Sequence, residues 1–215
     1  MSSLSSSDLR SLVVEAVAAG ADVIADAATA DRWEQPSALE GMTVGALCAH
    51  LVRAAGATIA YLDRTPVDRR PDGELLTPVT YFRAAVEAPI HNQIRDVSAD
   101  EAAIGQLAMA AKCRQLADDL ASRFADEPED RLLTALGGRM LTLDDFCRTR
   151  LIEVLLHLDD LTTSTGVVQP EIDPRGPAEV VDICMGIGVD RHGVWGVLAA
   201  LARAERSPRD VFPIF

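Results

Sequence analysis

Residues 149–161 have the sequence TRLIEVLLHLDDL, in which apolar residues recur with the period of a helix. Glu153 and His157 are four positions apart in this stretch. Side chains at positions i and i+4 lie on the same face of a helix, one above the other. An ionised carboxylate among so many leucines costs several kcal/mol unless it is paired or binds a metal. The stretch therefore predicts a mostly buried helix on which Glu153 and His157 hold one metal ion.

A second imidazole from another segment would complete such a site. Of the four histidines, His50 borders the apolar stripe of a predicted helix, whereas His91 and His192 lie in polar surroundings. Two imidazoles and one carboxylate, with positions left for water, are typical of a catalytic zinc centre. Nickel, iron and manganese also accept this ligand mixture. The spacing alone leaves an alternative, in which Glu153 pairs with Arg150 and His50 is a hydrogen-bonded core residue.

Two arginines are candidates for binding a substrate or the low-molecular-weight thiol discussed below. Arg150 precedes Glu153 by three residues and is predicted on the same helix face. There it either orients the carboxylate or holds an anionic group beside the metal. Arg83 lies in another helical segment and presents a cation to the interior if it faces inward; a solvated arginine is the alternative.

The chain as a whole predicts an all-α fold. We expect helices over 6–30, 43–64, 78–94, 98–124, 142–165, 177–189 and 194–206, with at most a short extended piece at 131–135. The segments 78–94 and 98–124 are either two helices or one kinked helix. Expected helix caps are Ser6 or Ser7, Thr43, Thr142 and a Ser98–Glu101 capping box. Long successive helices without paired strands indicate an antiparallel four-helix bundle. We expect a metal-binding bundle over residues 1–165 and a small helical extension over 166–215 that packs on it.

Composition excludes several classes of function. The net charge of −13 argues against a nucleic-acid partner, because phosphate binding needs a basic patch. The four cysteines are far apart and lack a C-x-x-C pair, as expected of reduced, buried thiols in the cytoplasm. No run of residues is as uniformly apolar as a membrane span of roughly 20 residues. We therefore expect a soluble cytoplasmic monomer or homodimer.

Three segments together resemble a known family. They are WEQPS at 33–37, GMTVGALCAHL at 41–51 and RLIEVLLHLDDL at 150–161. They resemble the mycothiol-dependent maleylpyruvate isomerase family, which belongs to the DinB/YfiT-like metal-binding four-helix bundles of actinobacteria. The resemblance implies a metal, usually zinc, held by His50, Glu153 and His157. The Gly-Trp that is frequent after the second histidine in the family is Leu158-Asp159 here.

The resemblance also implies a chemistry. The metal would acidify mycothiol, and the thiolate would attack a small electrophile, as in an S-transferase or a cis–trans isomerase. We expect the transferase in preference to the isomerase. Two alternatives remain: a hydrolase that uses metal-bound water, and a metal- or small-molecule-binding bundle without turnover.

Overall fold

The computed structural model describes residues 4–70, 73–86, 91–206 and 211–213, and it is all-α as predicted. The bundle is built from helices and one small hairpin. The helices are α1 (Ser6–Ala25), α2 (Ala27–Asp31), α3 (Val44–Arg64), α4 (Pro78–Val86), α5 (His91–Ala102), α6 (Gln106–Asp126), α7 (Leu143–Thr165) and α8 (Arg175–Ala202). Strands β1 (Leu132–Thr134) and β2 (Met140–Thr142) pair antiparallel around the 3-10 turn η1 (Leu136–Gly138), and a second 3-10 turn, η2 (Ala204–Arg206), follows α8.

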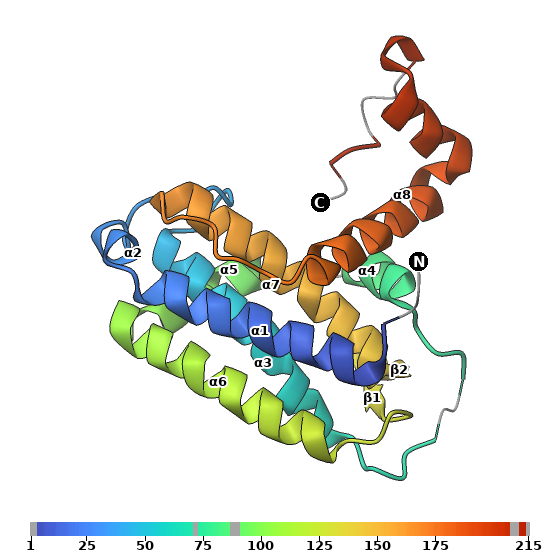
Figure 1. The fold of residues 1–215 in the computed structure, drawn as a ribbon, viewed down its shortest axis with the longest axis horizontal. Coiled ribbons are helices and arrows are strands. Elements are labelled where there is room, and N and C mark those ends of the chain that lie inside the picture. Colours follow the sequence, from blue (N-terminus) through green and yellow to red (C-terminus); the bar gives the residue numbers. More distant parts are fainter. Residues whose placement is uncertain (1–3, 71–72, 87–90, 207–210, 214–215) are drawn as a thin grey trace.

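Four long helices, α1, α3, α6 and α7, pack around the core of the bundle (Figure 1). The antiparallel arrangement holds for α1 against α6 and for α3 against α7. The chain colours also show α3 and α6 running in one direction and α1 and α7 in the other (Figure 1). The long connection 65–105, which contains α4 and α5, returns the chain to the end of the bundle from which α3 started. The carboxyl ends of α3 and α6 therefore lie at the same end of the bundle.

Side-chain caps fix where the two helices that matter most begin. Thr43 accepts a hydrogen bond from the backbone N–H of Ala46 at the start of α3. Thr142 does the same for Asp145 at the start of α7. Both caps were predicted, and they set the register that places His50 on α3 and Glu153 on α7.

Other predicted boundaries were wrong. Ser5, not Ser6 or Ser7, caps α1, and Asp26 ends that helix because its own carboxylate caps α2. Ser98 caps nothing: it is buried within α5, and its hydroxyl donates to the carbonyl of Ile94 one turn back. Helix α6 begins instead after Gly105, whose φ of 85° suits glycine. The helix expected over 78–94 is two elements, and residues 87–90 lie outside the described residues.

The two helices expected in the C-terminal segment are present, and they join at a kink to make up α8. The kink is at Gly193, where φ is 72° and ψ is 159°. Before the kink α8 packs on α4 and α7, and after it the helix extends away from the bundle (Figure 1). Of the predicted apolar tail, Val211 is buried, and residues 214 and 215 lie outside the described residues.

The core also accounts for the cysteines and the most apolar helix. Cys48, Cys113 and Cys147 are buried free thiols, Cys184 is half-buried, and burial raises the pKa of all four. Helix α3 is the one described helix that is long and apolar enough to span a membrane, contrary to the expectation from the sequence. Since 61% of its most apolar window is buried in the bundle, it has the burial of a core helix.

Candidate metal centre

His50, Glu153 and His157 converge where α3 packs on α7. One nitrogen or oxygen from each side chain lies within 4.8 Å of the others. Nε2 of His157 is 3.5 Å from Oε2 of Glu153, and the two imidazole rings are 4.6 Å apart between centroids. The structure thus brings together three residues predicted as ligands from segments about a hundred positions apart in sequence.

The donor set suits a divalent transition metal. Zinc binds imidazole nitrogen and carboxylate oxygen at about 2.0–2.2 Å, so neighbouring ligand atoms in a tetrahedral site are roughly 3.3–3.6 Å apart. The separation between His157 and Glu153 is in this range. All three residues are partly buried, and the side chains of His157 and Glu153 are 13% and 24% exposed.

Arg150 supports Glu153 from inside the bundle. Its guanidinium donates to the carbonyl of Ala54 at 3.0 Å and to the hydroxyl of Tyr81 at 3.2 Å, and it lies 3.9 Å from Oε1 of Glu153. Only 4% of the residue is exposed. The ion pair that the alternative interpretation predicted is therefore present together with the three-residue cluster, on the other oxygen of the carboxylate.

The three candidate ligands have strongly shifted pKa values. Burial would raise the pKa of Glu153, but the hydrogen bond to His157 and the charge of Arg150 lower it to about 2. Burial would lower the pKa of His157, but hydrogen bonds to Asp160 and Glu153 raise it to about 9. Burial, together with the charge of His157, lowers the pKa of His50 to about 4. Without a metal, a neutral His50 therefore lies beside a charged His157–Glu153 pair.

Sequence reasoning missed two residues that contact the candidate ligands. Oδ2 of Asp160 is 3.2 Å from Nδ1 of His157, and Nη2 of Arg53 is 3.1 Å from Nδ1 of His50. Each lies three positions after its histidine, so helix spacing was the available signal. Arg53 also donates to Ser98 of α5 at 2.6 Å, which connects His50 to that helix.

The remaining candidates lie on other elements. Arg83 is half exposed and forms an ion pair with Asp190 at 3.1 Å, joining α4 to α8. His192 immediately precedes the kink of α8, as expected for a residue at a helix break. The side chain of His91 lies outside the described residues.

Comparison with known proteins identifies the family. No curated protein and no solved structure matches the chain. The family model of the mycothiol maleylpyruvate isomerase N-terminal domain matches residues 13–162, which is more than half of the chain and includes His50, Glu153 and His157. The chain therefore belongs to the mycothiol maleylpyruvate isomerase family.

Proposed function

We propose that this protein is a metal-dependent enzyme that uses mycothiol to modify a small electrophilic substrate. The observation that carries the proposal is the convergence of His50, Glu153 and His157 in a chain of this family. A bound divalent metal, for which we propose zinc, would lower the pKa of a coordinated thiol and supply a thiolate at neutral pH.

The chain's own residues would hold the ligands in place. Asp160 accepts a hydrogen bond from Nδ1 of His157, which leaves Nε2 as the donor atom for the metal. Arg150 keeps Glu153 ionised and oriented toward His157. For Arg150 we retain the positioning role, and for Arg83, at the α4–α8 junction, the weaker proposal of a contact with the substrate.

The nucleophile in this proposal comes from outside the protein. Burial raises the pKa of Cys48, the cysteine nearest in sequence to a candidate ligand. A buried thiol with a raised pKa is a poor nucleophile. A small thiol would therefore attack the electrophilic carbon. In transfer the new S–C bond remains and a leaving group departs with its electron pair; in isomerisation the S–C bond breaks again after rotation.

The first experiment measures the metal content of the purified protein by mass spectrometry. We expect about one equivalent of zinc in the parent and its loss in His50→Ala and Glu153→Ala. His192→Ala, which removes a histidine from α8, is the matched control and should retain the metal. A parent that takes up no zinc even when it is supplied in excess would show the proposal to be wrong.

Activity assays then separate the remaining alternatives. Consumption of an electrophile such as chlorodinitrobenzene that requires mycothiol, and that is lost in His157→Ala, supports the proposed reaction. Hydrolysis without added thiol favours a hydrolase. A retained metal with no turnover of any electrophile favours a binding protein. The division at residue 165 and the cytoplasmic location remain predictions.

A further inference from the structure

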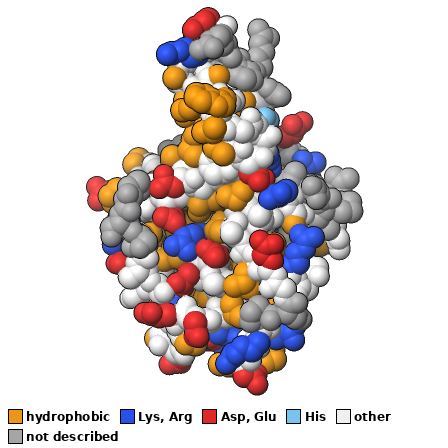
Figure 2. Space-filling view, turned by 90° about the vertical axis from the view of Figure 1, so that its right-hand side faces the viewer, with side chains coloured by type: hydrophobic (Ala, Val, Ile, Leu, Met, Phe, Trp, Pro, Cys, Tyr) orange, Lys and Arg blue, Asp and Glu red, His pale blue; other side chains and the backbone are white. Residues whose placement is uncertain are grey.

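The part of α8 beyond Gly193 exposes an unusually apolar surface. Residues 194–202 have the sequence VWGVLAALA, without a charged, hydroxyl or amide side chain. We call this segment the arm. Trp195 is 80% exposed, and Val194, Leu198 and Leu201 are about half exposed. Apolar side chains gather on the part of the molecule that projects from the bundle (Figure 2).

The exposed apolar residues of the arm differ from those in the loops. Val67 and Val168 stand singly, and single exposed residues are normal on a soluble protein. The four arm residues instead follow helical spacing and form one stripe along about two turns of helix. A helix that is apolar all round is normally buried. Among these residues only Val197 is buried, so most of the surface of the arm is uncovered.

We propose that the arm is a dimer interface and that it packs against the arm of a second copy of this chain around a two-fold axis. The same patch on both copies then serves as both halves of the interface, which is the usual arrangement in homodimers. Nine helical residues span about 13 Å, so the two stripes can align antiparallel along their whole length.

The exposed apolar area of the arm is large enough for an interface with a second copy of the chain. The four side chains expose roughly 400 Å² per copy, since a tryptophan offers about 150–250 Å² and an aliphatic side chain somewhat less. Two copies would bury about 800 Å² of apolar surface, which is the apolar share of an interface of roughly 1,200–1,600 Å². That is the size of a small specific interface.

The distribution of charge also favours a second copy. A net charge of −13 repels both another copy and an anionic membrane surface, except where the contact itself is uncharged. The arm is such a place. Asp190 and Arg191 precede it, and Arg203 and Glu205 follow it, so an antiparallel pair has both signs of charge at each end of the contact.

The test is the mass of the full chain in solution, measured by analytical ultracentrifugation across a concentration series. We expect the mass to rise from 23.0 kDa to twice that value. Trp195→Glu and Leu198→Glu should each stay at the monomer mass throughout, because each places a charge in the centre of the interface. Val168→Glu is the matched control: it changes a residue that is 87% exposed outside the arm and should dimerise like the parent.

Circular dichroism and metal content of the variants establish that the bundle is intact, so this inference is tested separately from the metal centre. A second expected result is that quenching of Trp195 fluorescence by acrylamide falls as the dimer forms. A parent that is monomeric at every concentration overturns the proposal. So does a dimer that survives both glutamate substitutions. Binding of a monomeric chain to phosphatidylcholine vesicles, lost in Trp195→Glu, would overturn it in favour of a membrane surface.

Discussion

His157 has a carboxylate at each nitrogen of its ring. Glu153 lies on the Nε2 side and Asp160 on the Nδ1 side. The partner of one ring nitrogen determines which tautomer the imidazole adopts, and hence which nitrogen has a lone pair for a metal. Asp160 therefore has a different task from Glu153, although both are acids on the same helix one turn from His157.

Replacing Asp160 by alanine should weaken zinc binding without abolishing it. Loss of such a hydrogen bond to a ligating histidine typically costs about 10–100-fold in affinity. Competition with a chromophoric chelator measures the change. Asp159→Ala is the control, because Asp159 is exposed and its side chain lies on another face of α7. Equal affinities in the two variants would show that Asp160 does not support the ligand.

The shifted pKa values predict how zinc binding depends on pH. At neutral pH the metal-free protein has a protonated His157, since its pKa is about 9, whereas His50, near 4, and Glu153, near 2, have already lost their protons. Zinc must displace that one proton. Affinity should therefore fall about tenfold per pH unit as pH decreases from 9 toward neutrality.

Calorimetry in buffers of different ionisation enthalpy counts the protons released, and we expect about one per zinc. Release of none or two would contradict this distribution of charge. The same shift affects stability without metal. The pKa of His157 is higher in the folded than in the unfolded chain, so its stabilising effect is complete below about pH 6.5 and is lost as pH rises through 9.

At the scale of single elements, α3 contains two glycines with opposite surroundings. A Cβ on Gly45 would lie 2.6 Å from Cε2 of Trp33, whereas one on Gly56 would meet Leu116 at an ordinary 3.7 Å. Gly45→Ala should destabilise the protein by about 1–3 kcal/mol because Trp33 must move. Gly56→Ala should stabilise it by up to about 1 kcal/mol through helix propensity. Urea unfolding measures the free energy of unfolding of both variants. If that free energy changed in the same direction in both, the packing of Trp33 on α3 would be contradicted.

Elements whose ends depend on local chemistry were predictable from sequence. Thr43 and Thr142 have the helix-capping pattern, and both form the expected bonds. Ser98 has the same pattern but lies inside α5, because a serine hydroxyl bonds equally well to the carbonyl one turn back. Only the packing of α5 on α3 distinguishes the two outcomes, and no local pattern encodes that packing.

The candidate site divides in the same way. Glu153 and His157 follow from helix spacing, and His50 follows from its place beside the apolar stripe of a predicted helix; the family resemblance implies the same three residues. Helix spacing places Arg53 one turn after His50, but its orientation toward that ring depends on Ser98 and therefore on the position of α5. The contact of Asp160 with His157 depends on the conformation of its side chain, which spacing alone does not give.

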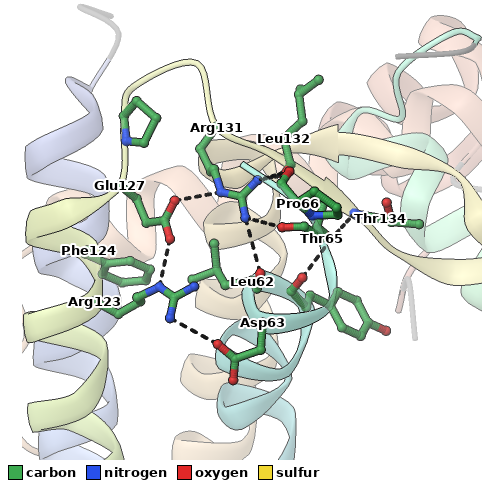
Figure 3. Close-up of polar contacts among 12 residues, drawn as sticks. Leu62, Asp63, Thr65, Pro66, Arg123, Phe124, Glu127, Arg131, Leu132 and Thr134 are labelled. Atoms are coloured by element: carbon green, nitrogen blue, oxygen red, sulfur yellow. Dashed lines mark hydrogen bonds and ion pairs between the residues drawn. The ribbon is translucent and has the colours of Figure 1, made fainter. Parts of the chain in front are cut away.

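At the scale of the whole molecule, the directions of the helices place two negative helix ends side by side, and these need positive charge nearby. Helices α3 and α6 run in the same direction, so their carboxyl ends, each with a partial negative charge and unpaired carbonyls, lie at one end of the bundle. Arg131 lies between them and is almost fully buried (Figure 3). It donates to the carbonyls of Leu62 and Thr65 at the end of α3 and to the carboxylate of Glu127 just after α6.

Arg10 of α1 serves the same end of the bundle from the other side. Its guanidinium donates to the carbonyls of Glu127 at 2.7 Å and Pro128 at 2.9 Å. Two buried arginines thus satisfy the carbonyls at the ends of α3 and α6. In a bundle in which all neighbouring helices were antiparallel, these two helix ends would lie at opposite ends of the bundle.

Arg131→Met should therefore be among the most destabilising substitutions in this chain. It removes the donors to the buried carbonyls of Leu62 and Thr65 and one of the two arginines bonded to Glu127, which keeps its bond to Arg123. Each buried acceptor left without a partner costs about 1–3 kcal/mol. Urea unfolding measures the loss against Arg139→Met, which removes an exposed arginine from the same hairpin and should change stability by less than about 0.5 kcal/mol. Since His50 lies in the second turn of α3 and Glu153 and His157 lie near the middle of α7, all away from this end of the bundle, the folded fraction of Arg131→Met should still bind zinc. A similar change in the free energy of unfolding in both variants would contradict this prediction. It would mean that the packing of the methionine compensates for the lost hydrogen bonds of Arg131, and that the parallel helix ends need no cation.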